Sequence, residues 1–541
     1  MMSQQASVDR LPADVISITF AMVAEVDIPR PADNTRQPPE ERGGDIGWMR
    51  LGQVNRRWRG IYLSSATLWG GIITVFPTPT IMEEIMRRSK RAPVVLDLRT
   101  IRDPQVRLSL VQKCLDRARV LREEYGVGSP MEDIWARQTL AGQRLDVLED
   151  LNLEYAFPME REPEEPPYVQ LSSMAPLDAP FLTRAVLTTF IPLMARRLRT
   201  LTAHNVWKAT VSEMVGYLGA FPALEELRLK LKIVDIPMHF AAPVPEVQLQ
   251  QLRIFTNECD DFSIVHLVQR MTIPATTKLE FYLGQKDVKD AQDAHDLRTL
   301  CQTISTQLRL PSHNELIVDY DSATHLCVVP QGIVLEEYET IPVEKGVIIG
   351  GGYELSHATA LACVMTEVAQ TVSSLVVRNC RPDDLPVPVA IADLHPFFLS
   401  LVAVEELHVH HCSQRVYGAF LESPLFPRLK KVILDFNTSP WAGNDTHDVR
   451  WFQYLCEMLS TRQDAGYPVV EEIILTGSHS RSKCKEASEC FDLDHDDVMS
   501  LCTYATKVTD ERPARRPDLM DDEYVGFSRA VHEVLVAHRG L

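Results

Sequence analysis

Basic charge is scarce in this chain of 541 residues. Lysine and arginine together number 55, against 74 aspartates and glutamates, so the formal net charge is -19. A protein that binds nucleic acid through its phosphates needs a basic face. The charge balance therefore argues against nucleic acid as a partner and suits a soluble protein of the cytoplasm, the nucleus or both.

Long apolar runs and paired cysteines are lacking as well. The first apolar stretch, residues 15–26, already contains Glu25 and is shorter than the ~18 apolar residues expected of a membrane span. The polar residues 1–9 do not resemble a secretory signal. The 11 cysteines are an odd number, scattered from Cys114 to Cys502, which favours reduced thiols. We therefore expect no membrane partner.

Catalytic, metal and cofactor motifs are also lacking. The sequence contains no GxSxG, HExxH or kinase set, and the glycines at 350–352 fit neither phosphate-binding frame. The histidine-rich segment 408–412 has no second cluster at zinc spacing, and residues 492–503 lack the Gly and Glu of a calcium loop. We expect no enzyme, metal or cofactor, with an enzyme hidden in the irregular middle of the chain as the weakest alternative.

A recurrent apolar unit dominates the chain from about 141 to 480. The chain exceeds the ~250–300 residues that one core serves, so it is several domains or a repeat array. Each unit has an apolar residue, two others, a second apolar residue, one spacer and a third. Seven copies are Leu148-Leu151-Leu153, Leu224-Leu227-Leu229, Leu249-Leu252-Ile254, Val372-Leu375-Val377, Val404-Leu407-Val409, Leu429-Val432-Leu434 and Val470-Ile473-Leu475, with weaker copies centred on Leu201, Leu279 and Leu316.

The spacing of the copies matches a leucine-rich repeat of strand and helix. The central residues Leu201, Leu227, Leu252 and Leu279 are 26, 25 and 27 residues apart, within the ~20–29 of that template. Helical patterns at 212–220, 262–271 and 449–459 lie between the strands. We expect one parallel sheet with strands in chain order and helices on one face. An ordinary α/β domain with leucine-rich strands is the alternative.

Polar or small residues follow several strands at a constant distance. Asn257, Cys380, Cys412 and Asn437 stand three residues after the third apolar position of their copies. An inward amide or thiol at that point can bond backbone groups left free where the strand ends. The sequence therefore predicts turn-stabilising side chains at these positions.

The N-terminal block predicts two amphipathic helices. Val15, Ile16, Phe20 and Val23 are assigned to one helical face. Residues 51–61 form a second pattern, with Leu51, Val54, Trp58 and Ile61 inward and the arginines at 56, 57 and 59 outward. Two helices of this size cannot close a core of their own, which predicts a partner. The alternative is a helical cap on the repeats.

These residues carry a resemblance to a known family. The segments LPADVISITFAMV (11–23) and IGWMRLGQVNRRWRGIYLSSATLW (46–69) resemble the two halves of an F-box, through Leu11-Pro12, the run from Arg56 to Arg59 and Leu68-Trp69. With MEEIMRRSKRAPVVLDL (82–98) the block is similar to the large F-box family of mushroom-forming fungi. In that family an F-box precedes degenerate leucine-rich repeats.

The resemblance implies a substrate-recognition subunit of a Skp–cullin–F-box type ubiquitin ligase. The F-box would bind the Skp-type adaptor and through it the cullin-based complex, and the repeats would bind an unknown target protein. The runner-up function is a non-catalytic leucine-rich-repeat scaffold without a ligase role. The implied adaptor-binding residues are Leu11, Pro12, Val15, Ile16, Phe20, Val54, Trp58 and Trp69.

The expected domain order follows. An α/β fold is predicted, with a small helical F-box at 8–75 that contains a polar insert at 27–45. A helical connector with one strand spans 76–140, and the leucine-rich-repeat-like solenoid with a parallel sheet spans 141–480. A loose segment and a C-terminal helix at 524–538 make up 481–541.

Side chains alternate along each repeat strand, so the spacer residues point away from the core. Stacked strands then form one continuous strip that mixes basic residues with a few apolar ones. This composition predicts an acidic peptide or protein surface as the target. The strip comprises Arg228, Lys230, Arg253, Phe255, Val376, Arg378, His408, His410 and Lys431.

Overall fold

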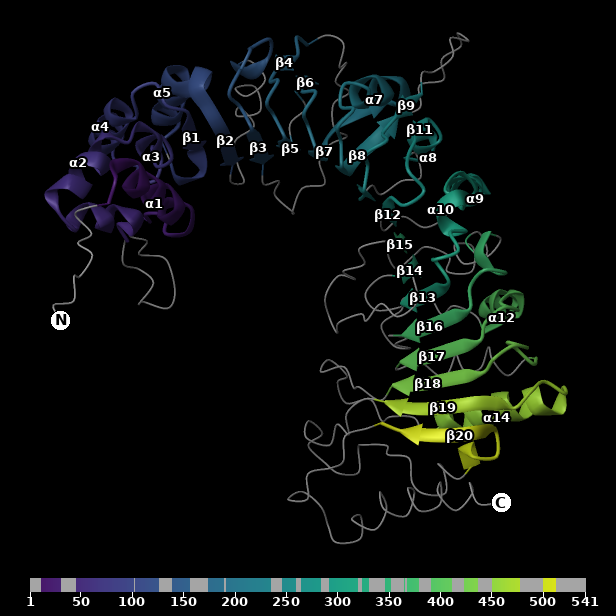
Figure 1. Ribbon diagram of the computed structural model, residues 1–541. Coiled ribbons are helices and arrows are strands. Elements are labelled where there is room, and N and C mark those ends of the chain that lie inside the picture. The colour runs from purple at the N-terminus through teal and green to yellow at the C-terminus, as the bar shows by residue number, and fades with distance from the viewer. Residues whose placement is uncertain are drawn as a thin grey trace, which may run out of the picture. The chain divides into compact units, whose positions relative to one another are not determined.

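A computed structural model gives the arrangement of the chain (Figure 1). It divides into two compact units, unit 1 being residues 1–252 and 270–273, and unit 2 being residues 253–269 and 274–541. The residues described are 11–30, 45–101, 103–125, 139–155, 174–188, 191–234, 246–258, 264–283, 291–319, 324–329, 346–351, 364, 367–378, 391–410, 423–435, 450–476 and 500–511.

Unit 1 begins with a helical module. Its elements are α1 (Ala13–Val26), η3 (Gly47–Gln53), α2 (Arg56–Ser64), α3 (Ala66–Gly70) and α4 (Pro79–Ser89). The prediction of one helix through 51–61 is wrong, because the helical conformation is interrupted at Asn55. The Asn55 Oδ1 atom accepts a hydrogen bond from the backbone N–H of Trp58 at 2.8 Å and so begins α2 afresh.

The remainder of unit 1 is a parallel sheet with strands in chain order. The predicted strand at 94–98 is present as β1, whereas β2 was not foreseen. Leu151, Leu153, Leu227 and Leu229 are buried on one face, as the repeat pattern predicts. The strands are β1 (Val94–Asp97), β2 (Ala118–Tyr125), β3 (Asp150–Tyr155), β5 (Arg184–Leu187), β7 (Thr200–Thr210) and β8 (Glu226–Val234).

Short elements connect these strands. Two-stranded parallel pairs form between β4 (Leu177–Asp178) and β6 (Leu193–Met194), and between β9 (Val247–Gln248) and β11 (Met271–Thr272). Helix α7 falls where the sequence predicts a helix, and a capping box between Thr210 and Glu213 begins it. The helical connections are η4 (Leu98–Thr100), α5 (Pro104–Cys114), η5 (Leu115–Arg117) and α7 (Val211–Leu218).

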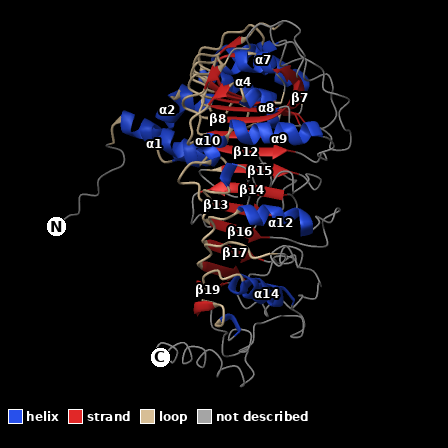
Figure 2. Ribbon diagram, turned by 90° about the vertical axis from the view of Figure 1, so that its right-hand side faces the viewer, coloured by secondary structure: helices blue, strands red, loops and turns tan. Residues whose placement is uncertain are grey.

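Unit 2 is built on a long, mostly parallel series of strands. Figures 1 and 2 place helices α9, α12 and α14 along one side of its strands. The helices are α8 (Ile264–Val268), α9 (Ala291–Thr303), α10 (Ser305–Leu308), α12 (Ile391–Ser400) and α14 (Arg450–Asp464). The strands are β10 (Ile254–Asn257), β12 (Lys278–Leu283), β13 (Glu315–Asp319), β14 (Thr324–Val329), β15 (Val347–Gly351), β16 (Ser374–Arg378), β17 (Glu406–His410), β18 (Lys431–Asp435), β19 (Val470–Thr476) and β20 (Ala505–Asp510).

The predicted parallel arrangement in chain order is confirmed for β16 to β20 and is wrong for β13 to β15. Strands β16, β17, β18, β19 and β20 pair in parallel and in sequence. Strand β14 runs antiparallel to both β13 and β15, and the order is β12-β15-β14-β13-β16. The connection from Asp319 to Thr324 is too short for a parallel crossover, which needs a dozen or more residues, so β14 must fold back.

One repeat copy is displaced by three residues. The copy at 249–254 predicts Ile254 in the core, yet the strand residue buried there is Phe255, whose ring packs edge-on against Phe281 with centroids 5.6 Å apart. The reason is that Leu249 and Leu252 close the turn before the strand, with the Leu252 N–H bonded to the Leu249 carbonyl at 3.1 Å. The prediction that Phe255 is an exposed target-binding residue is therefore wrong.

The displaced register also changes the role of Asn257. It occupies a core position, fully buried, and neither amide atom hydrogen-bonds to another atom in the structure's described part. The turn bond predicted for its side chain is absent there. Cys380, Cys412 and Asn437 lie outside the described residues, as does the helix predicted at 524–538. Strand β20 falls within the segment that the sequence predicts to be loose.

Replacing Asn257 by leucine is expected to raise the free energy of unfolding by about 1 kcal/mol, because an unpaired buried amide costs about 1–3 kcal/mol. Urea denaturation measures the change. Asn314→Leu is the matched control and should destabilise, since the Asn314 Nδ2 atom donates to Ser373 Oγ at 3.2 Å. A loss of stability in the Asn257 variant as large as in the control would show that this amide is bound.

Candidate protein-docking site

The helical module has a core of five aromatic side chains. Adjacent rings in this cluster lie with their centroids 5.0 to 6.5 Å apart, and large aromatic rings bury more area than other side chains. Such a cluster lets a small module close a core of its own, which the sequence analysis did not anticipate. The rings belong to Phe20 of α1, Trp48 of η3, Trp58 and Tyr62 of α2, and Trp69 of α3.

This core divides the residues that the resemblance assigns to adaptor binding. Ile16, Phe20, Trp58 and Trp69 are buried in the module. The other four, Leu11, Pro12, Val15 and Val54, are exposed. The buried four support the shape of the module, so direct contact with a partner falls to the exposed four and to residues around them.

Helix α1 is apolar on two faces. Ile16 and Phe20 point into the aromatic core, whereas Val15, Ile18, Met22 and Val26 recur at intervals of three or four residues on another face. Leu11 precedes the helix at the same interval. These five residues, Leu11, Val15, Ile18, Met22 and Val26, are here called the α1 stripe. Their exposed fraction rises from 37% at Leu11 to 82% at Val26.

The α1 stripe is the least expected feature of the module. A helix on the surface of a globular protein normally buries one apolar stripe and shows water a polar face. Contiguous exposed apolar residues mark sites of protein contact. Ile18, Met22 and Val26 are not among the predicted docking residues, because the helical pattern places Val15 on the same face as Ile16 and Phe20. Projecting residues 11–26 down the helix axis separates the two apolar faces and identifies the stripe from the sequence.

Charged residues lie on the other elements of the module and at the end of α1. Arg56, Arg57 and Arg59 of α2 are exposed, as predicted, and the Arg59 Nε atom donates to the carbonyl of Gly52 at 3.2 Å. The C-terminal end of α1 is fixed by an ion pair of Asp27 with Arg50, whose closest N–O distance is 3.0 Å. The insert is closed at its base by backbone hydrogen bonds between Arg30 and Asp45.

Helix α4 packs on α3 within the module and is bonded at its end to η5, which leads into β2. The guanidinium of Arg88 in α4 lies 4.6 Å above the ring of Trp69. The Arg117 guanidinium donates to Ser89 Oγ at 3.1 Å and to the carbonyls of Lys90 and Ala92, where α4 ends. A partner bound to α1 would therefore also be connected, through α4, to the first strands of unit 1.

The predicted target-binding residues of the sheet differ in exposure and in the bonds they make. Arg228 and Arg253 are exposed and Lys230 is half-buried. His408 and Lys431 both bond to Glu406, at 3.0 and 2.8 Å, and these contacts lower the pKa of Glu406 to about 2. Val376 is buried on the same side as His408. The side chains of Arg378 and His410 lie outside the described residues.

No family model matches the chain, and no curated protein matches it. In the described stretches, no helix combines the length and apolarity needed to cross a bilayer.

Proposed function

We propose that this chain is the substrate-recognition subunit of a Skp–cullin–F-box type ubiquitin ligase and does no chemistry itself. The α1 stripe binds the Skp-type adaptor, which links the chain to the cullin-based complex, and the sheets hold a target protein. The observation that carries this proposal is a helix whose second apolar face is exposed, in a module that has a core of packed aromatic rings.

The energetics of the stripe are those of a protein interface. Fully burying one aliphatic side chain of this size contributes about 1.5–3 kcal/mol, and each of the five stripe residues is more than a third exposed. A few such side chains suffice as the centre of an interface. The exposed arginines of α2 favour an acidic partner and would speed its approach.

A scaffold without a ligase role is the second candidate. The observation that favours it is the attachment of α4 of the module to η5, through the hydrogen bonds of Arg117, because a cap that covers the end of a repeat sheet needs such contacts. A cap alone leaves the α1 stripe without a purpose, and that is the reason we place the ligase subunit first.

Titration of the full chain with purified Skp-type adaptor tests the proposal. We expect a saturable one-to-one complex by calorimetry and size-exclusion chromatography, with a negative heat-capacity change because apolar area is buried. Its formation should slow as salt rises, while the affinity changes little. Absence of a complex at the highest adaptor concentration would refute the ligase role and favour the scaffold.

A further inference from the structure

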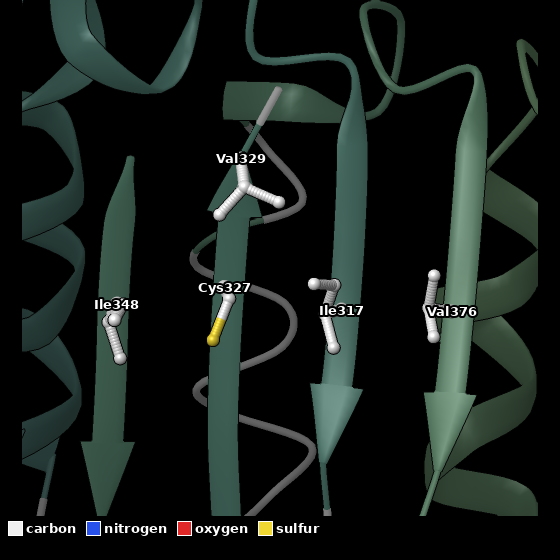
Figure 3. Close-up of a cluster of buried hydrophobic side chains, with 5 residues drawn as sticks. All are labelled: Ile317, Cys327, Val329, Ile348 and Val376. Carbon is white, nitrogen blue, oxygen red and sulfur yellow. The ribbon is translucent and has the colours of Figure 1, made fainter. Parts of the chain in front are cut away.

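The described residues of the predicted target strip on β16 to β18 are buried or paired. Val376 is buried among apolar side chains of neighbouring strands, which Figure 3 shows side by side. His408 and Lys431 both bond to Glu406. The apolar cluster comprises Ile317, Cys327, Val329, Ile348 and Val376, each at most 6% exposed. An acidic target needs cations that are exposed and have no such partners.

Positive charge gathers where two segments of unit 1 meet. Residues 83–91 include the end of α4, and residues 113–119 include the end of α5, η5 and the start of β2. The two segments are here called the basic junction. They contain seven basic and three acidic residues, in a chain whose formal net charge is -19. The basic residues are Arg87, Arg88, Lys90, Arg91, Lys113, Arg117 and Arg119.

Direct contacts hold the two segments of the basic junction together. The Arg117 guanidinium donates to Ser89 Oγ at 3.1 Å and to the carbonyl of Ala92 at 3.2 Å. The Cys114 Sγ atom lies 3.8 Å from the Met86 Sδ atom, although the two residues are 28 positions apart in the sequence. Cations from both segments therefore share one surface.

Three of the seven cations already have partners within the chain. Arg87 and Arg88 each bond to Glu84 at 2.7 Å, and Arg117 bonds to backbone carbonyls where α4 ends. The other four make no ion pair or side-chain hydrogen bond with any residue that the structure describes. These four exposed cations are Lys90, Arg91, Lys113 and Arg119.

Helix ends account for only part of this charge. Cations near the C-terminal end of a helix stabilise its dipole, and Lys90 and Lys113 lie at the ends of α4 and α5. Arg91 lies in the turn before β1, and Arg119 lies in β2. Both are outside the two helices, so a structural role at a helix end does not explain them.

The composition of the basic junction favours an acidic peptide over a nucleic acid. The junction contains no aromatic residue, whereas proteins that bind single-stranded nucleic acid stack its bases on aromatic side chains. A long polyanion would also meet the negative charge of the rest of the chain. A short acidic segment is affected mainly by charges within about 8 Å at physiological ionic strength. Within the basic junction, cations outnumber carboxylates.

We infer that an acidic segment of the target protein binds the basic junction through its four exposed cations. Complementary charge steers such a segment to this surface and fixes its register there. This inference rests on the proposed function, because it presupposes that the chain has a target. It keeps the acidic target predicted from the sequence and places its binding site beside α4 instead of on the strip of strand residues.

Titration of a fluorescein-labelled oligoglutamate peptide with the full chain, followed by fluorescence anisotropy, tests this inference. We expect saturable binding that weakens at least about fivefold between about 50 and 500 mM NaCl, because salt screens exposed charge pairs. Lys90→Glu with Arg91→Glu should weaken binding at least about tenfold, since two attractions become repulsions. Lys113→Glu with Arg119→Glu should have a similar effect, because both segments supply the site.

The matched control reverses two exposed arginines, Arg196 and Arg197, in another turn of unit 1. The turn at 195–198 is closed by a backbone hydrogen bond of 3.0 Å, as the turn at 89–92 is by one of 2.9 Å. It precedes β7, which lies four strands from β1 in the sheet, or about 19 Å at about 4.8 Å per strand. Arg196→Glu with Arg197→Glu should therefore change peptide binding less than about twofold.

The midpoint temperature of thermal unfolding shows whether each variant folds. If Lys90→Glu with Arg91→Glu does not fold, Lys90→Gln with Arg91→Gln takes its place, with an expected loss of about threefold or more. Unchanged peptide binding by folded variants of either segment overturns the inference. An equal loss in the control also overturns it, because only the net charge of the chain would then matter.

Two further arms of the experiment separate other partners. Tighter binding of a single-stranded oligonucleotide of the same length would assign the basic junction to nucleic acid and overturn the inference. Adaptor titration on the same preparations distinguishes the inference from the proposed function. Peptide binding without adaptor binding would refute the ligase role alone, whereas adaptor binding without peptide binding would refute the inference alone.

Discussion

Replacing Ile18 and Met22 together by aspartate is expected to weaken adaptor binding by about a hundredfold or more. Both side chains are over half exposed in the centre of the α1 stripe, so their change removes apolar contact and places two carboxylates against an apolar partner surface. The midpoint temperature of thermal unfolding should stay within a few degrees of that of the unchanged protein, because neither side chain belongs to the aromatic core. Calorimetric titration with purified adaptor measures the loss.

The control for this variant adds the same two charges elsewhere on α1. Ser17 and Ala21 are exposed and lie on neither apolar face of the helix. Ser17→Asp with Ala21→Asp should therefore retain adaptor binding within about threefold. Equal losses in the two double variants would show that net charge on α1 matters and that the stripe does not. Full binding by the Ile18 and Met22 variant would refute docking through the stripe.

The repeat strands could be predicted from the sequence because their chemistry is periodic. Leu375, Leu407 and Val432 are buried at every expected position, and their strands are parallel neighbours. The pattern failed where the true frame matches the template less well than a neighbouring one. Leu249, Leu252 and Ile254 fill all three apolar positions, whereas the frame of Leu252 and Phe255 puts the polar Asn257 at the third. The structure adopts the second frame because a turn closes at Leu252.

The reversed strand β14 was missed for a different reason. The sequence at 315–329 has two apolar runs with a short polar connection, which is a hairpin signal in its own right. The assumption of one repeated unit overrode that local signal. The two faces of α1 show the same effect: an apolar residue such as Val15 can face the core or a partner, and composition alone does not distinguish them.

Gly70→Ala tests how firmly the helical module is joined to the sheet of unit 1, and we expect it to cost about 2–3 kcal/mol or more of unfolding free energy. A β-carbon at Gly70 would overlap the carbonyl oxygen of Pro93, the residue just before β1, so the backbone of one of the two segments would have to shift. Gly60→Ala is the matched control, since Gly60 lies in α2 with no atom within 4 Å of an added β-carbon. Alanine is more favourable than glycine inside a helix by about 1 kcal/mol, so this control variant should be slightly more stable than the unchanged protein.

Chemical denaturation followed by tryptophan fluorescence measures the unfolding free energy of both variants, because Trp69 neighbours Gly70. A Gly70 variant as stable as the control would mean that the module and β1 are not in close contact.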